Sequence, residues 1–394
     1  MTITIIITLC ILLLIAYVFD LTSAKTRIPS VILLLLLGWA VKQFTLWFGI
    51  KLPDFSNLLP ILGTFGLILI VLEGALELDV NQTKFLIIRK SIIGAVFHLI
   101  VLAFLLAAVF YFSGDHSFKD SLTNAIPFCV ISSAIAIPSV RNQKTSIREF
   151  VTYESSLSDI LGVLIFNFLI LNQVINFLSF SEFLMQLLVM ALISFLATIG
   201  LSLLLNRIEH HVKFIPIILL IVLIYSVSEV FHLPGLILIL IFGLFIVNLD
   251  ELKRFQWIDR LRPDNLNQEA IKFKELVIEA TFLVRASFFL LFGYLIKTSD
   301  VINVTTIPWA AGIVLLIFAL RAIQLKLSNL PMNPLLFVAP RGLITILLFL
   351  NIVPSHRIPL VNESLVIQVI LLTAVSMMPG LLASRVEPKK DSSS

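Results

Sequence analysis

Residues 153–162, YESSLSDILG, place two acids and three serines inside an otherwise apolar helix. On a helix, Ser155, Ser158 and Asp159 share one face because they are spaced by three and four residues. Glu154 precedes Asp159 by five residues and therefore points about 140° away around the axis. A charge at the centre of a membrane helix costs at least about 2.5 kcal/mol, so each acid needs a partner or a function. We expect the two acids to contact different neighbours.

The shared face is interpreted as a binding site for a monovalent cation. Hard alkali cations prefer carboxylate, hydroxyl, carbonyl and water oxygens, and Asp159 with Ser155 and Ser158 supplies such oxygens. The alternative is that Asp159 bonds a neighbouring helix and the serines are small interface residues. Asn or Ser would make a packing bond at far lower cost than a carboxylate, which favours the cation site. Glu154 is expected to pair with a buried arginine.

The composition excludes a soluble protein. Of 394 residues, 59% are hydrophobic and 13% are charged, whereas soluble proteins carry about 25% charged residues. Apolar windows of about 19 residues predict an all-α polytopic membrane protein, with one transmembrane domain over residues 1–394. About thirteen spans are predicted, at residues 3–19, 30–48, 58–78, 89–112, 121–141, 150–176, 182–206, 213–230, 233–249, 273–297, 306–327, 333–353 and 361–384.

The basic residues report the orientation of the chain. Most of the 28 Lys and Arg residues fall on one side if the loops alternate. The positive-inside rule then places the N-terminus outside and the short tail 385–394 in the cytoplasm. We expect an integral protein of a bacterial cytoplasmic membrane. Because the basic residues are scattered singly, no nucleic-acid partner is expected.

Two further helices are interrupted by helix breakers, at residues 131–138, ISSAIAIP, and 339–345, APRGLIT. Breaks at corresponding places in two halves indicate inverted repeats, whose crossed half-helices present backbone dipoles to an ion at the bilayer midplane. For a lone proline-containing helix, a harmless kink is the alternative. Pro138 and Pro340 are expected to end half-helices. The residues expected to support the two breaks are Ser132, Ser133, Pro138, Pro340, Arg341 and Gly342.

Several motifs resemble the cation:proton antiporter superfamily, in particular its sodium/proton exchanger branch of the monovalent cation:proton antiporter-1 type. ESSLSD at residues 154–159 resembles the family's Glu-Ser-x-x-Asn-Asp signature. SVSEVFHLPG at residues 226–235 resembles its Ala-Glu-x-x-x-x-Ser-Gly segment. Shorter likenesses to the family's third, tenth, eleventh and twelfth helices lie at residues 72–78, 288–293, 320–322 and 340–342.

The resemblance implies roles for single residues. Asp159 is implied to carry the cation and the proton in turn, Glu154 and Arg321 to form a buried ion pair, and Arg341 to steady the second broken helix. Ser158 stands where the family usually has Asn, and residues 132–134, Ser-Ser-Ala, stand where the branch usually has Thr-Asp-Pro. The choice among Na⁺, K⁺ and Li⁺ therefore stays open, with Na⁺ expected first.

The resemblance also implies a homodimer with an elevator-like moving core. Scaffold and dimerisation helices are expected in residues 1–78 and 182–297, and core transport helices in residues 89–176 and 306–384. With one titrating acid at the site, exchange is expected to be electroneutral, because an arginine such as Arg321 keeps its proton. No cofactor is expected.

Other classes of protein were weighed against an antiporter. A channel or a sodium-coupled solute symporter on a similar scaffold would not move protons in the opposite direction to the cation. A membrane enzyme needs a nucleophile or histidine with a base in reach, and His98 lies alone in its apolar span. A sensor would need a signalling domain, and no such domain is visible.

Four further features of the sequence concern charged residues outside the expected site. Glu229 is expected to cap or pack a helix junction, and Glu73 to be structural, with a funnel role as the alternative. Arg285 lies inside an apolar span and has no clear family counterpart. The linker 250–274 mixes charges with aromatic residues, which is typical either of an amphipathic segment on the cytoplasmic face or of a solvated loop.

Overall fold

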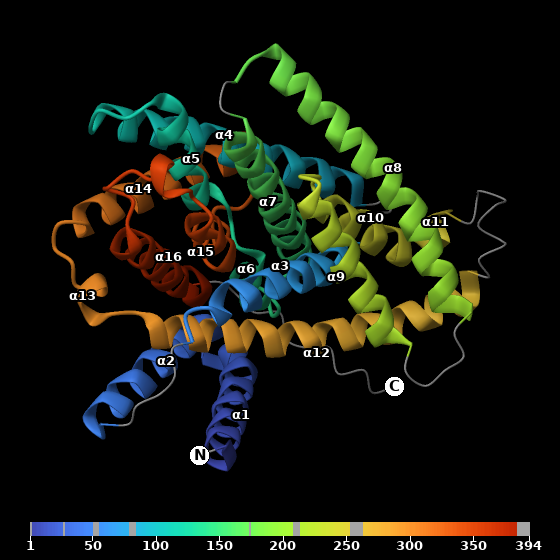
Figure 1. The fold of residues 1–394 in the computed structure, drawn as a ribbon, viewed down its shortest axis with the longest axis horizontal. Helices are drawn as coiled ribbons and strands as arrows, with labels where there is room; N and C mark the ends of the chain where they lie inside the picture. Colours follow the sequence, from blue (N-terminus) through green and yellow to red (C-terminus); the bar gives the residue numbers. More distant parts are fainter. Residues whose placement is uncertain are drawn as a thin grey trace.

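The computed structural model describes residues 2–26, 28–49, 55–78, 84–172, 175–207, 213–252 and 263–383. The predicted tail 385–394 and residues 253–262 of the predicted linker lie outside these ranges, whereas linker residues 250–252 and 263–274 are helical. Within them the chain is helical and contains no strand. The helices, drawn in Figure 1, are α1 (Thr2–Thr26), α2 (Ser30–Trp47), α3 (Leu58–Glu77), α4 (Phe85–Phe112), α5 (Phe118–Cys129), α6 (Ser133–Ser139), α7 (Thr145–Leu171), α8 (Phe177–Arg207), α9 (Phe214–Val230), α10 (Leu236–Val247), α11 (Leu249–Leu252), α12 (Pro263–Leu295), α13 (Thr298–Val301), α14 (Ile307–Leu327), α15 (Leu343–Leu350), the 3-10 turn η3 (Pro354–His356) and α16 (Glu363–Ala383).

Each of the thirteen predicted spans contains a helix. In the described part of the chain, nine helical segments are long and apolar enough to cross a membrane, with α5 and α6 taken together as one segment. The described portion of α1, α9 and α10 are shorter apolar helices. The predicted span 333–353 contains only the eight residues of α15, preceded by irregular chain. The prediction of an all-α polytopic membrane protein is therefore confirmed.

The helices pack in two groups that meet around α3 and α7 (Figure 1). In one group, α12 packs along α2 and α3, and α10 packs between α3 and α8. In the other group, α4 packs against α5, α7 and α14, while α14 packs against α16. Contacts from α3 to α7 and from α3 to α15 join the two groups. The first group corresponds to the predicted scaffold segments and the second to the predicted core segments.

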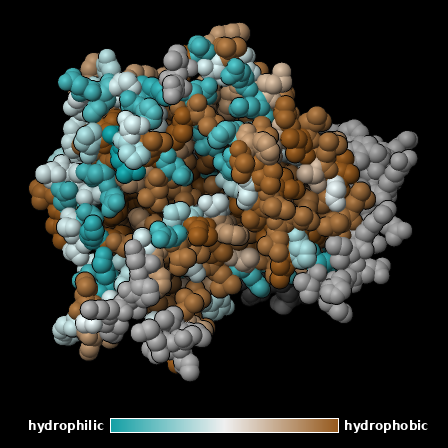
Figure 2. All heavy atoms as spheres, in the orientation of Figure 1, coloured by the Kyte–Doolittle hydropathy of each residue, from teal (hydrophilic) through white to brown (hydrophobic). Residues whose placement is uncertain are grey.

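Apolar side chains cover much of the outer surface. Figure 2 shows hydrophobic residues over the right-hand half of the viewed face, where α8 and α9 lie in Figure 1. On α8, residues four apart, Leu184, Leu188, Leu192 and Leu196, are all exposed. Such a stripe is unfavourable in water and suited to lipid, because lipid tails are as apolar as leucine.

The first break separates α5 from α6 and is held open by three backbone amides. Val130 and Ser132 adopt extended conformations. The Ile131 N–H donates to Ser158 Oγ (2.9 Å), the Ser132 N–H to the Pro340 carbonyl (2.9 Å), and the Ser133 N–H to Asp159 Oδ2 (3.2 Å). Partners outside the helix thus replace the bonds that a continuous helix would make here.

The second break lies directly against the first. Residues 338–342 are not helical, and α15 begins at Leu343. A Cβ atom on Gly342 would lie 2.7 Å from Ile135 Cδ1 and 2.8 Å from Ser132 Oγ. The two interrupted segments therefore cross in backbone contact, and glycine permits the approach because it has no side chain.

Two details of the breaks differ from expectation. Pro138 does not end a half-helix at the crossing, because the break comes at residues 130–132 and Pro138 lies inside α6, next to its last residue. Pro127, inside the last turn of α5, is the proline that immediately precedes the break. The arm before the second break, residues 333–337, forms turns instead of a half-helix.

Candidate functional site

Asp159 lies at the crossing and is fully buried. Its Oδ2 accepts hydrogen bonds from the Ser133 backbone N–H (3.2 Å) and from the Ser133 hydroxyl. Ser133 is the first residue of α6, so the carboxylate faces the positive end of that short helix. The other oxygen, Oδ1, is buried and has no hydrogen-bond partner in the described part of the chain. One half of the carboxylate is thus fixed and the other half is left to bind a further group.

The serines expected beside Asp159 are used differently from one another. The Ser155 hydroxyl donates to the Val151 carbonyl of its own helix (2.7 Å), and Ser158 Oγ accepts from the Ile131 N–H. The structure therefore brings Ser133 to Asp159, although residue spacing favoured Ser155 and Ser158. Each of those two oxygens retains a lone pair, so their role as cation ligands stays a prediction. Several other buried hydroxyls lack a partner within the described ranges, among them those of Ser132, Ser156 and Thr345.

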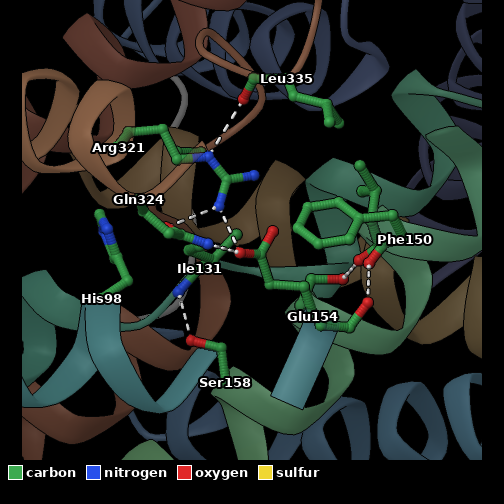
Figure 3. Close-up of polar contacts among 12 residues, drawn as sticks. His98, Ile131, Phe150, Glu154, Ser158, Arg321, Gln324 and Leu335 are labelled. Carbon is green, nitrogen blue, oxygen red and sulfur yellow. Dashed lines mark hydrogen bonds and ion pairs between the residues drawn. The ribbon is translucent and has the colours of Figure 1, made fainter. Parts of the chain in front are cut away.

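Glu154 of α7 and Arg321 of α14 point towards each other (Figure 3), and Glu154 lies about 140° from Asp159 around the axis of α7. Arg321 Nη1 forms an ion pair with Glu154 Oε1, and the exposed fractions of the two side chains are 0% and 1%. Gln324 Nε2 donates to the same carboxylate oxygen (2.5 Å), and Gln324 Oε1 accepts from Arg321 Nη1 (3.3 Å). Sequence reasoning did not find Gln324. One signal in the sequence could have indicated it. Gln324 follows Arg321 by three residues on an apolar helix, and residues with this spacing lie on the same helix face.

The Arg321 guanidinium also holds the chain that leads to the second break. Its Nε donates to the Leu335 carbonyl (3.1 Å) and its Nη2 to the Val338 carbonyl (3.4 Å). The guanidinium carbon lies 5.8 Å from the centre of the Phe150 ring. Arg321 therefore links α7, α14 and residues 335–338, in a geometry that uses several donors of the planar guanidinium.

Arg341 joins the two breaks through backbone carbonyls. Its Nε donates to the Phe128 carbonyl (2.6 Å), in the last turn of α5, and its Nη1 to the Ala339 carbonyl (2.7 Å). A cation at this position complements the negative end of α5. The two halves of the first interrupted segment are thus complemented at the break, α5 by Arg341 and α6 by Asp159.

His98 of α4 is the next neighbour of Arg341. Arg341 Nη2 lies 3.0 Å from His98 Nε2. Because the guanidinium can only donate, Nε2 is the acceptor and the imidazole carries its proton on Nδ1. That Nδ1 is buried without a partner among the described residues. His98 is thus part of the polar network around the crossing, which its isolated position in the sequence did not indicate.

A second group of charges joins the two packing groups away from Asp159. Asp20 on α1 lies 3.3 Å from Arg141, which precedes α7, and 3.8 Å from Arg285 on α12. Glu73 on α3 is buried, and Arg285 is the charge that acts on it most strongly. Arg285 therefore has two acidic neighbours, Asp20 and Glu73, whose negative charges compensate its positive charge. No group of three or more potential metal ligands among His, Cys, Asp and Glu occurs in the described part of the chain.

Two interrupted helices that cross beside a buried carboxylate, inside a chain of apolar helices, define a secondary transporter. The sequence over residues 9–383 matches the family described as sodium/hydrogen exchanger, transmembrane. The chain belongs to this family, and its activity is cation/proton antiport. The resemblance seen in its motifs is thereby confirmed.

Solved structures agree with this assignment at the level of the fold. The chain is similar to the sodium proton antiporter MjNhaP1 from Methanocaldococcus jannaschii at pH 8, with a TM-score of 0.71 and 18% identity over 96% of this chain and 99% of that chain. An electron-microscopy structure of the same antiporter gives a TM-score of 0.64 and 18% identity over 97% and 95% of the two chains. Comparison with curated proteins gives no match.

Proposed function

We propose that the protein exchanges a monovalent cation, Na⁺ before K⁺ or Li⁺, for protons, one for one, and that Asp159 carries both in turn. The observation that supports this proposal is the buried Asp159 carboxylate at the crossing, with Oδ2 fixed by Ser133 and Oδ1 without a partner. Unlike Glu154, Asp159 forms no ion pair within the described residues, and a buried carboxylate without one is too costly to keep for packing alone. It is suited to binding a positive charge in either form, H⁺ or a metal cation.

Exchange follows from competition for one carboxylate. A proton on Oδ1 neutralises Asp159 and removes the charge that binds the cation, while a bound cation disfavours the protonated form. The hydroxyls of Ser155 and Ser158, on the same face of α7, would complete the cation's oxygen ligands. Each passage through the membrane then carries either the cation or the proton.

The arginines support electroneutral stoichiometry. Arg321 is paired with Glu154, and Arg341 is held by carbonyls, so neither guanidinium releases a proton during the cycle. The Glu154 carboxylate is engaged by Arg321 and Gln324. Asp159 remains as the one carboxylate at the crossing that can change its charge.

For the movement, we propose an elevator in a homodimer of a bacterial cytoplasmic membrane, with the N-terminus outside. The core group of α4–α7 and α14–α16 carries Asp159 past the scaffold group of α1–α3 and α8–α12. Most helix–helix packing lies within these two groups, with α3 joining them to each other, and this arrangement supports a sliding of one group against the other.

The first test is Asp159→Asn, which removes the exchangeable charge and keeps the side-chain size. We expect exchange to fall to the level of empty proteoliposomes for Na⁺, Li⁺ and K⁺, each tested in turn with a pH-sensitive dye. Glu182→Gln, which removes an exposed acid on α8, should leave exchange unchanged. Cation-dependent proton movement that persists in Asp159→Asn would contradict the proposal. A channel or a symporter would show cation uptake without proton counterflow.

A further inference from the structure

A cavity of about 260 Å³ lies between the scaffold and the core, on the side where α7, α9 and α15 end. This is the side predicted to face outward. We call it the outer cavity, and it is lined by residues that include Thr64, Leu67, Val163, Asn167, Glu229 and Asn351.

The outer cavity extends towards Asp159. Val163, which lines it, lies four residues after Asp159 on α7 and therefore on the same helix face, about 6 Å further along the axis. Ile344, also in the lining, follows the second break by two residues. The cavity on the opposite side, lined by Ala134 and Arg141 among others, has a volume of only about 30 Å³. The outer cavity is thus the wider approach to the crossing.

Backbone dipoles make the outer cavity attractive to cations. Three helices end in its wall, α7 at Leu171, α9 at Val230 and α15 at Leu350, and residues of each last turn line it. The C-terminal end of a helix carries about half a negative charge. Glu229, in the last turn of α9, is the one acid among the described residues that line the cavity, where Tyr225 and His232 are its neighbours.

The cap of α9 does not need the Glu229 carboxylate. The His232 N–H donates to the Glu229 main-chain carbonyl (3.0 Å) and the Leu233 N–H to the Ser228 carbonyl (2.8 Å), while His232 has φ of 56°. These bonds form a Schellman cap, which uses only the main chain. A carboxylate at a helix C-terminus is electrostatically unfavourable for the helix. The Glu229 side chain accepts a hydrogen bond from the Tyr225 hydroxyl one turn earlier, and the amide oxygen of a Gln at this position could accept the same bond.

We propose that the outer cavity is a binding site for a hydrated monovalent cation, held by Glu229 and the three helix ends before it passes to Asp159. This inference deepens the proposed function and rests on it. It replaces the expectation that Glu229 only caps or packs a helix junction. Half-buried Glu229 and the amide of Asn167 would bind the cation through its water shell, because the volume exceeds that of a bare ion.

The electrostatic potential in the outer cavity is measured with a single reactive cysteine. In a chain with Cys10→Ala, which leaves only the buried Cys129, Asn351→Cys places a thiol at the cavity mouth. Its reaction rates with a cationic trimethylammonium-ethyl and an anionic sulfonatoethyl methanethiosulfonate are compared with those of a free thiol. We expect the cationic reagent to be favoured, and Glu229→Gln to reduce the rate ratio by roughly fivefold or more, the strength of one charge pair in water-like surroundings.

Glu182→Gln is the matched control, because Glu182 lies near the start of α8, which is predicted to begin at the same face, and does not line the cavity. It should leave the rate ratio unchanged. A ratio equal to that of the free thiol, or one that is the same with Glu229 and with Gln at that position, would overturn the proposal. Labelling does not depend on transport, so this result is independent of the outcome for Asp159→Asn.

Transport from the two sides tests the passage to Asp159. In oriented membrane vesicles, Glu229→Gln should raise the apparent KM for Na⁺ at the face that carries the labelled cysteine by about fivefold and leave the KM at the opposite face unchanged. A purely structural role would alter both faces. Equal KM values for Glu229→Gln and the parent chain at the labelled face would contradict cation capture at this site.

Discussion

Glu154 shows at the scale of single residues how a buried charge is maintained. Its carboxylate accepts from both Arg321 and Gln324, and all three side chains are buried. Removing one partner of such a pair leaves the other charge buried and uncompensated, which costs about 3–5 kcal/mol. Glu154→Gln should therefore lower the melting temperature of the purified protein strongly, while the order of preference among Na⁺, Li⁺ and K⁺ stays unchanged. A stable Glu154→Gln variant with an altered cation preference would show that this carboxylate binds the transported ion.

The double variant Glu154→Gln with Arg321→Gln provides the control for that prediction. Removing both charges should cost less than the sum of the two single changes, because neither partner is left alone. Glu182→Gln gives the baseline for loss of an exposed acid. If the losses of stability in the two single variants simply add in the double variant, the ion pair contributes no interaction energy of its own.

At this scale the sequence identified the charged residues better than their contacts. Asp159, Glu154 and Arg321 stood out because ionisable residues are rare in apolar spans. Ser133 did not stand out as the neighbour of Asp159, because helix spacing says which residues of α7 share a face and nothing about which segment crosses that face. Gln324 is neutral and attracted no attention, and His98 was considered only as the histidine that a membrane enzyme would need. Their contacts follow from tertiary packing.

At the scale of elements, the crossing depends on close backbone contact. Gly342 has an extended conformation (φ of −165°) that any residue adopts, so the need for glycine is one of space. A methyl group in Gly342→Ala would press on Ser132, whose N–H donates to the Pro340 carbonyl. Overpacking of this kind costs about 1–3 kcal/mol. We expect Gly342→Ala to reduce exchange by about tenfold or more, measured by dye assay in proteoliposomes at equal protein content.

Gly312→Ala is the matched change for that experiment. Gly312 lies in α14, and a Cβ atom there would meet nothing within 4 Å. Alanine is the better helix former by up to about 1 kcal/mol, so this variant should exchange normally and melt no earlier than the parent. Normal exchange by Gly342→Ala would mean that the two breaks tolerate separation.

The elements themselves were predictable to a large extent. Each apolar window contains a helix because a span across lipid must satisfy its own backbone hydrogen bonds. The place of the first break was less predictable. Serine and proline residues are spread over residues 127–138. The break falls at residues 131–133, where Ser158, Pro340 and Asp159 accept hydrogen bonds from the three backbone N–H groups. Those acceptors come from distant parts of the chain, so no local signal located it.

At the scale of the whole molecule, one ion pair joins the two packing groups on the side predicted to be cytoplasmic. Arg141 belongs to the core, and Asp20 belongs to the scaffold, where Arg285 is its second neighbour. Asp20, Arg141 and Arg285 can be read from the sequence as single charges. That they contact one another could not be predicted, because the contact depends on how α1, α7 and α12 pack. The 30 Å³ cavity beside Arg141 and the 260 Å³ outer cavity describe one state, which is wider on the side predicted to face outward.

The proposed elevator predicts that scaffold and core separate at Asp20 and Arg141 once in each cycle. Asp20→Cys with Arg141→Cys, joined by a flexible reducible cross-linker in a chain with Cys10→Ala, should therefore stop exchange, and reduction should restore it. The matched control is Lys84→Cys with Glu149→Cys, a pair 3.0 Å apart that links the start of α4 to α7 within the core and on the same side. Cross-linking that pair should leave exchange intact, because its two ends travel together. Dye-monitored exchange before and after reduction measures both pairs, and full activity of the cross-linked Asp20–Arg141 pair would show that scaffold and core do not move apart there.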